Sequence, residues 1–169
     1  MTRVLVACVG NIFLGDDGFG TEVAAALRSR VLPGGEPLDE VRVEDFGIRS
    51  VHLVYELLTG YDVLVLVDTV AHQDGPSGTL YVIEPDLPPR GTGADPPPEV
   101  MLDPHDLSPG GVMTLVPTLG GSVDRIVVVG CQPGSLEEGI GLTDEVRNAV
   151  EPAADLVCRV LEAEMRRKS

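Results

Sequence analysis

Two adjacent acids, Asp16 and Asp17, lie in a glycine-rich segment that runs from Gly10 to Gly20. The segment follows an apolar stretch, residues 4–9, that is typical of a buried strand, and it leads into a stretch with helical periodicity. A strand, a glycine-rich turn and a helix form the first half of a βαβ unit. In an open parallel sheet, ligands bind at such turns. Paired carboxylates there suit cation binding or general-base chemistry.

The spacing of the glycines does not fit a nucleotide-binding loop. Gly10, Gly15, Gly18 and Gly20 do not form the G-x-G-x-x-G pattern. A phosphate loop of the G-x-x-x-x-G-K-[ST] type would need lysine where Asp16 stands, and two carboxylates would repel a phosphate. A nucleotide- or sugar-binding module is therefore disfavoured.

A second acid and a histidine are the other residues that could act at this site. Asp68 ends an apolar strand predicted over residues 62–68, and burial of an acid is costly unless it is used or paired. Because the carboxyl ends of parallel strands share one edge of the sheet, we expect Asp17 and Asp68 to converge. His105 could fold over the same edge from a later loop. Two carboxylates and one imidazole would suit Ni, Zn or Mn.

Each of these residues also has a simpler structural interpretation. Asp17 could be an acid that favours a helix N-terminus, and His105 alone could be a surface histidine. His72, four residues after Asp68, is a candidate fourth ligand, although its position favours a solvated loop. We expect Asp16 to lie nearer to solvent, where it would shape the turn or accept hydrogen bonds from backbone N–H groups.

The three cysteines lack the spacing of a metal knuckle or a disulfide pair. Cys8 lies in a predicted strand and Cys158 in a predicted helix, so both are expected to fill the core. Cys131 ends a strand at the predicted ligand-binding edge, as a nucleophile would, but no base lies near it in sequence. A nucleophilic role for Cys131 is therefore disfavoured.

Length and composition indicate one folded domain over residues 1–169. The 43% of apolar residues argues against disorder. Acidic residues outnumber basic ones by 27 to 12, for a formal charge of −15, which disfavours binding to nucleic acid or an anionic membrane. The first apolar run is far shorter than a membrane span or a typical signal-peptide core. We therefore expect a cytoplasmic protein.

The order of the elements predicts an α/β fold with three α/β/α layers and a mostly parallel sheet of about five strands. One strand, at 78–84, follows its predecessor too closely for a helical crossover, so it is expected to be antiparallel or at an edge. The expected strands span residues 4–9, 41–45, 62–68, 78–84 and 124–130, and the expected helices lie near 19–31, 49–58, 107–118 and 143–166. Thr143 should cap the last helix and Pro152 should kink it. Prolines predict a long loop over residues 85–104.

Four segments resemble, in sequence order, the hydrogenase maturation endopeptidases. They are the glycine-rich loop 10–20, the strand 63–69 with its acid, the Asp-Pro-His-Asp-Leu segment at 103–107, and residues 127–133 with 140–143. The resemblance covers about residues 3 to 165. It departs at residues 45–48, which are Asp-Phe-Gly-Ile where that family usually has Asp-Gly-Gly-Thr.

The resemblance implies an endopeptidase that removes the C-terminal extension of a [NiFe]-hydrogenase large-subunit precursor after nickel insertion. It implies that Asp17 and Asp68 are catalytic and that, with His105, they engage nickel. The nickel would belong to the substrate, and no organic cofactor is implied. A carboxylate base and a metal-polarised water are both sound ways to activate the hydrolytic water. The alternative function is a non-catalytic nickel-checkpoint chaperone of the same precursor.

Overall fold

The structure is a computed structural model that describes residues 2–33, 40–48, 50–71, 73–85 and 123–167. Within these ranges, five strands form one sheet in the order β2-β1-β3-β5-β4. The strands are β1 (Arg3–Val9), β2 (Glu40–Gly47), β3 (Val63–Thr69), β4 (Leu80–Ile83) and β5 (Arg125–Cys131). All neighbours pair in parallel except β4, which is antiparallel to β5 at the edge of the sheet. This confirms the predicted mostly parallel sheet and its antiparallel edge strand.

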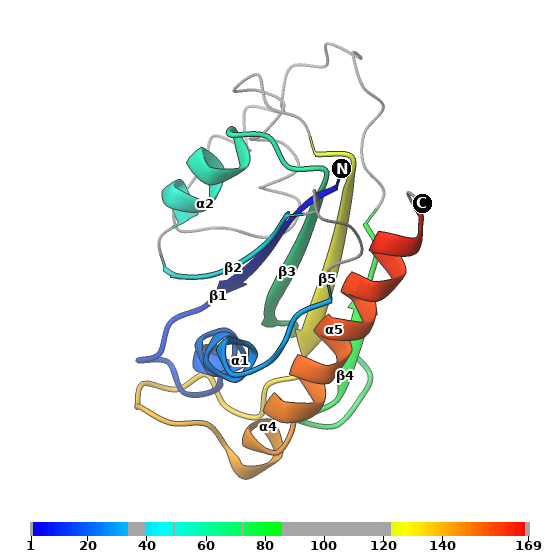
Figure 1. Cartoon of the computed structure of the whole chain (residues 1–169). Coiled ribbons are helices and arrows are strands. Elements are labelled where there is room, and N and C mark those ends of the chain that lie inside the picture. The colour runs from blue at the N-terminus through cyan, green and yellow to red at the C-terminus, as the bar shows by residue number, and fades with distance from the viewer. Residues whose placement is uncertain (1, 34–39, 49, 72, 86–122, 168–169) are drawn as a thin grey trace.

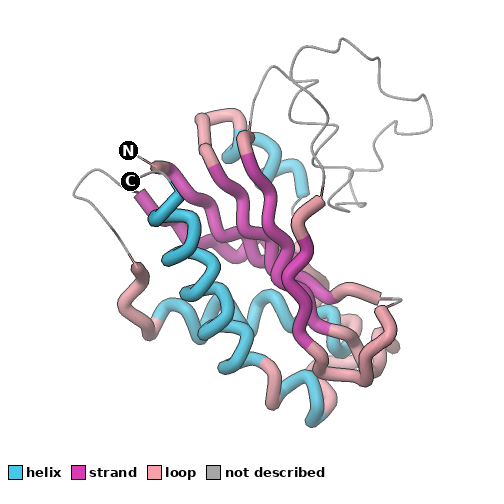
Figure 2. Tube along the Cα trace, turned by 90° about the vertical axis from the view of Figure 1, so that its right-hand side faces the viewer, coloured by secondary structure: helices cyan, strands magenta, loops and turns pink. Residues whose placement is uncertain are grey.

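Helices cover both faces of the sheet, as Figures 1 and 2 show. α1 (Phe19–Arg28) and α5 (Val150–Arg167) pack on one face with the side chains of Val4, Val6 and Cys8. α2 (Ser50–Leu57) packs on the other face with the alternate residues of β1, beginning at Leu5. Because β1 is covered on both sides, its sequence is a continuous apolar run. The predicted three-layer α/β/α architecture is confirmed.

The last helical segment differs from the single kinked helix that we predicted over residues 143–166. It forms a short helix, α4 (Asp144–Arg147), and then α5, with a turn at residues 148–149. Pro152 lies in the first turn of α5, where its missing N–H would have no helical partner. The chain breaks ahead of the proline, so Pro152 starts a new helix and does not kink a continuous one. The predicted helix near 107–118 and residues 86–104 of the predicted loop lie outside the described residues.

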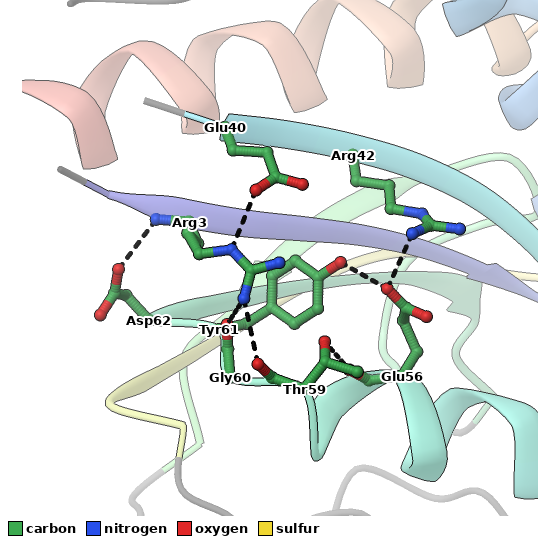
Figure 3. Close-up of polar contacts among 8 residues, drawn as sticks. All are labelled: Arg3, Glu40, Arg42, Glu56, Thr59, Gly60, Tyr61 and Asp62. Carbon is green, nitrogen blue, oxygen red and sulfur yellow. Dashed lines mark hydrogen bonds and ion pairs between the residues drawn. The ribbon is translucent and has the colours of Figure 1, made fainter. Parts of the chain in front are cut away.

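A polar cluster lies at the N-terminal ends of the strands, which form the end of the sheet opposite the predicted site (Figure 3). Nε of Arg3 donates to Oε2 of Glu40 at 2.9 Å, and its backbone N–H donates to Oδ2 of Asp62 at 2.8 Å. The Arg3 guanidinium also lies 4.6 Å from the centre of the Tyr61 ring, whose hydroxyl donates to Oε1 of Glu56 at 2.6 Å. These contacts tie the N-terminal ends of β1, β2 and β3 together. Because these three strands are parallel, their carboxyl ends lie together at the opposite end of the sheet.

None of the helices in the described part of the chain is both long enough and apolar enough to cross a membrane.

Candidate active site

The loop after β1 folds back on itself to place Asp17. Gly10 has a φ of 144°, and a Cβ at this position would lie 2.0 Å from the backbone oxygen of Asp17, so a side chain there is excluded. The backbone N–H of Asn11 donates to Oδ2 of Asp17 at 2.8 Å. Asp17 itself lies in a short 3-10 helix, η1 (Gly15–Gly18), just before α1. The glycine and the asparagine thus orient the Asp17 carboxylate at the carboxyl end of β1.

Asp68 and Asp17 are linked through Thr69, which donates a hydrogen bond to each carboxylate. The hydroxyl of Thr69 donates to Oδ1 of Asp17 at 3.1 Å, and its backbone N–H donates to Oδ1 of Asp68 at 2.7 Å. Asp68 and Thr69 are the last two residues of β3. The structure therefore brings the acid of η1, after β1, and the acid of β3 together at the carboxyl ends of these strands. Thr69 was not among the residues that we singled out from the sequence, although it directly follows the predicted acid.

The surroundings of Asp68 disfavour its ionised form. Burial, and then the negative charge of Asp17, raise the pKa of the Asp68 carboxyl to about 7, against the opposing effect of the hydrogen bonds from Thr69. Asp68 can therefore exchange a proton near neutral pH. That property is typical of a carboxylate that acts as a general base.

Asp16 has a different position and environment from its neighbour. The expectation that it lies nearer to solvent is wrong, because the side chain is fully buried. Its Oδ2 accepts hydrogen bonds from the backbone N–H groups of Gly134 (2.7 Å) and Ser135 (2.9 Å) and from the hydroxyl of Thr143 (2.9 Å). Its Oδ1 accepts one from the backbone N–H of Thr143 (2.7 Å). The predicted role of Asp16 as an acceptor of backbone N–H groups is present, but with a distant segment of the chain.

The hydrogen bonds also control the charge of Asp16. Burial alone would raise its pKa, but the bonds from Thr143, Ser135 and Gly134 outweigh that effect, and the pKa lies below its usual value. The ionised carboxylate thus holds the segment 134–143 against the first loop. Thr143 occupies the N-cap position of α4, as expected for the start of the last helical segment, but its side chain makes no capping bond and its hydroxyl donates to Asp16 instead.

Comparison with known proteins places this architecture in a family. The sequence model described as hydrogenase maturation protease matches residues 22–160. The chain belongs to the hydrogenase maturation protease family. It is accordingly a peptidase of hydrogenase maturation, with Asp17 and Asp68 paired at the carboxyl edge of its sheet.

Individual relatives agree with this assignment. The chain is similar to the hydrogenase expression/formation protein HupD of Bradyrhizobium diazoefficiens, with 33% identity over 94% of this chain and 78% of the relative. It is 30% identical to the hydrogenase 2 maturation protease of Escherichia coli, over 94% of this chain and 90% of that protein. The solved structure of the hydrogenase maturating endopeptidase HybD from E. coli has a TM-score of 0.70 and 25% identity, and covers 96% of this chain and 94% of its own.

The cysteine at this edge of the protease lacks the properties of a nucleophile. Cys131, the last residue of β5, is paired in register with Thr69 and is fully buried. Burial and then the charge of Asp16 raise the pKa of its thiol to about 11, against a hydrogen bond with the backbone of Gly78. The thiolate, which is the reactive form, is therefore scarce at neutral pH. Cys8 is equally buried, and burial raises its pKa to about 12.

The two histidines named from the sequence, His105 and His72, lie outside the described residues. His52, on α2, is exposed. Among the residues that the structure describes, no three histidine, cysteine or acidic side chains are grouped so that they could hold a metal ion. The oxygens of Asp17 and Asp68 are hard donors of the type that binds divalent metal ions, so the acid pair fits a role as part of a ligand set.

Proposed function

We infer that this protease removes the C-terminal extension of a [NiFe]-hydrogenase large-subunit precursor after nickel has been inserted. The observation that carries this proposal is the Asp17–Asp68 pair around Thr69, at the edge where open α/β sheets bind ligands. Relatives that are named hydrogenase maturation proteases support it. The resemblance in four segments supports the choice of substrate.

In this proposal Asp68 acts as the general base. Water attacks the carbonyl carbon of the scissile peptide bond, and its proton passes to the Asp68 carboxylate. The same proton is then delivered to the nitrogen of the departing extension, so that the carboxylate is regenerated. The negative charge of Asp17 raises the proton affinity of the Asp68 carboxylate beside it. Hydrogen bonds from Asn11 and Thr69 hold Asp17 in place for this role.

The second part of the proposal concerns how the precursor is recognised. Nickel in the precursor would be bound by carboxylate oxygens of Asp17 and Asp68 and by His105, which the resemblance assigns to this role, and it would anchor the cleavage site there. The two carboxylates support this because each can accept more contacts than the hydrogen bonds that it accepts from the described residues. The protease would need no organic cofactor.

The proposal is tested by incubating the purified protease with a nickel-loaded large-subunit precursor and following the precursor by intact-mass spectrometry. Loss of the mass of the C-terminal extension is expected with the wild-type protein and is expected to be absent with Asp68→Ala. Asp74→Ala, which removes an exposed acid, is the matched control and should cleave like wild type. Binding of the precursor with no mass loss would contradict the proposal and favour the checkpoint chaperone.

A further inference from the structure

Four large apolar side chains are exposed on two loops beside the acid pair. Ile12 and Phe13 lie in the loop after β1, with 42% and 61% of their surface exposed. Leu136 and Ile140 lie in the loop after β5, with 44% and 79% exposed. We call these four residues the rim patch. Such clustering is informative because single exposed apolar residues are common on soluble proteins, whereas contiguous apolar patches mark interaction sites.

The two loops of the rim patch are joined by backbone hydrogen bonds. The backbone N–H of Gly139 donates to the carbonyl of Phe13 at 2.8 Å, and the backbone N–H of Gly15 donates to the carbonyl of Gly139 at 2.9 Å. Gly15 has a φ of 57°, and a Cβ there would lie 2.9 Å from the carbonyl oxygen of Ser135, so the close approach of the loops needs glycine. Figure 1 shows the loops side by side at the lower left. Phe13 and Ile140 therefore flank one connected surface.

The buried carboxylate of Asp16 fixes this surface in place. It joins the first loop to Gly134, Ser135 and Thr143, which lie on both sides of Leu136 and Ile140 in the sequence. Loops that are already ordered lose little conformational entropy when a partner binds. The rim patch is thus a preformed surface on which a partner can dock.

The rim patch is also connected to the acid pair through Asn11. The side-chain oxygen of Asn11 accepts a hydrogen bond from the backbone N–H of Phe13 at 2.9 Å. The backbone N–H of Asn11 donates to the Asp17 carboxylate at 2.8 Å. A polypeptide that covers Phe13 therefore lies next to the residues that are proposed to cleave it.

Charge decides which kind of partner fits. Two exposed acids, Glu137 and Glu138, lie in the loop between Leu136 and Ile140. The whole chain carries a formal charge of −15, so a second copy of it would be repelled. A partner with lysine or arginine around an apolar segment would be attracted, and such complementarity also speeds association.

We propose that the rim patch is the docking surface for the precursor, and that it binds an apolar segment of the precursor flanked by basic side chains. This inference rests on the proposed function, but it concerns affinity for the precursor and not the cleavage step. It assigns the contact to residues other than the acids that are proposed to engage nickel.

Nickel-free precursor separates binding through the rim patch from binding through nickel. It lacks the metal anchor and is not expected to be cleaved during the measurement. Its Kd is measured by biolayer interferometry with wild-type protease and with the Phe13→Ala/Ile140→Ala double variant. We expect the double variant to bind about tenfold more weakly, because a few large side chains carry most of the binding energy of an interface. The Glu137→Gln/Glu138→Gln variant should associate more slowly at low salt and depend less on salt than wild type.

Tyr55→Ala is the matched control. Tyr55 is 65% exposed, much like Phe13, but it lies on α2. This helix covers the face of the sheet opposite to α1 and α5 (Figure 1). Removal of the Tyr55 side chain should leave the Kd unchanged. Ile140→Lys is a second test at the most exposed of the four positions. It should weaken binding of a basic partner, with no change in the thermal unfolding of the protease.

An unchanged Kd in both the double variant and Ile140→Lys would overturn the inference, even if wild-type protease cleaves nickel-loaded precursor normally. A wild-type dimer that the double variant dissociates, detected by analytical ultracentrifugation, would also overturn it, because the rim patch would then bind a second copy. Failure of the wild-type protein to cleave nickel-loaded precursor would refute the proposed function instead, and the Kd comparison would still decide the docking surface.

Discussion

The Asp16 carboxylate accepts two hydrogen bonds from Thr143, from its backbone N–H at 2.7 Å and from its hydroxyl at 2.9 Å. The two residues are 127 positions apart in the sequence, so this contact joins the first loop to the start of α4. Asp16 thus stabilises the frame of the site, whereas its neighbour Asp17 faces the acid of β3. Asp16 and Asp17 are adjacent residues of the same type, but their side chains point in different directions and therefore have different roles.

Asp16→Asn should destabilise the protein substantially. An amide can replace one carboxylate oxygen as acceptor, but its NH₂ group would then face an N–H donor of Thr143 or those of Gly134 and Ser135. Leaving such buried donors unpaired is expected to lower the free energy of unfolding by about 3 kcal/mol. Urea denaturation measures the change.

The control for Asp16→Asn is Asp74→Asn, which removes one negative charge from an exposed position. It should change the free energy of unfolding by less than about 0.5 kcal/mol, as surface substitutions usually do. Equal effects of the two substitutions would show that the hydrogen bonds to Asp16 contribute little.

Asp68→Asn should make the protease less active and more stable. Loss of the general base is expected to reduce cleavage by about 10²–10⁴-fold. The substitution also removes a charge that burial and Asp17 disfavour, so the free energy of unfolding at pH 8 should rise by about 2–4 kcal/mol. A folded variant that retains wild-type cleavage would contradict the assigned role of Asp68.

The stability gain from Asp68→Asn should depend on pH. Asp68 has its ordinary pKa of 3.8 when unfolded and a pKa of about 7 when folded. Between these values the folded protein keeps a proton that the unfolded chain has lost, so the contribution of Asp68 to stability falls as the pH rises from about 4 to 7. The difference in free energy of unfolding between variant and wild type should therefore be larger at pH 8 than at pH 5. The same difference at both pH values would argue against a raised pKa.

Cys131→Ala should leave the cleavage rate within about twofold of wild type, because the buried thiol has a pKa of about 11 and is not ionised at neutral pH. Removal of its sulfur from the core should cost about 1 kcal/mol of stability, since a small cavity results. The mass assay measures the cleavage rate, and urea denaturation measures the change in stability. Complete loss of cleavage in a stably folded Cys131→Ala protein would restore Cys131 as a candidate nucleophile.

The sheet could be predicted from the sequence because each of its central strands is a continuous apolar run between turn residues. β1 and β3 agree with their predicted ranges to within about one residue, and the short connection before β4 correctly indicated an antiparallel edge strand. The break between α4 and α5 was missed. Helical periodicity continues through residues 148–149, whereas the structure has a turn there, in which the backbone N–H of Ala149 donates to the carbonyl of Val146.

The convergence of Asp17 and Asp68 could be expected because topology alone brings the carboxyl ends of β1 and β3 together. The burial of Asp16 could not, since it depends on hydrogen bonds to a segment more than a hundred residues away. The bridging position of Thr69 likewise depends on the rotamer of one side chain, which no sequence pattern specifies. The nickel-binding roles of Asp17, Asp68 and His105 remain predictions from the family resemblance.

The most direct test of the account uses protease that has been treated with a chelator and then desalted. Its cleavage of nickel-loaded precursor is compared with its cleavage of nickel-free precursor by intact-mass spectrometry. The account predicts rapid loss of the C-terminal extension from the nickel-loaded precursor and none from the nickel-free one, because the metal that Asp17 and Asp68 engage belongs to the substrate. Equal cleavage of the two precursors, or loss of activity on the nickel-loaded one after chelation, would contradict it.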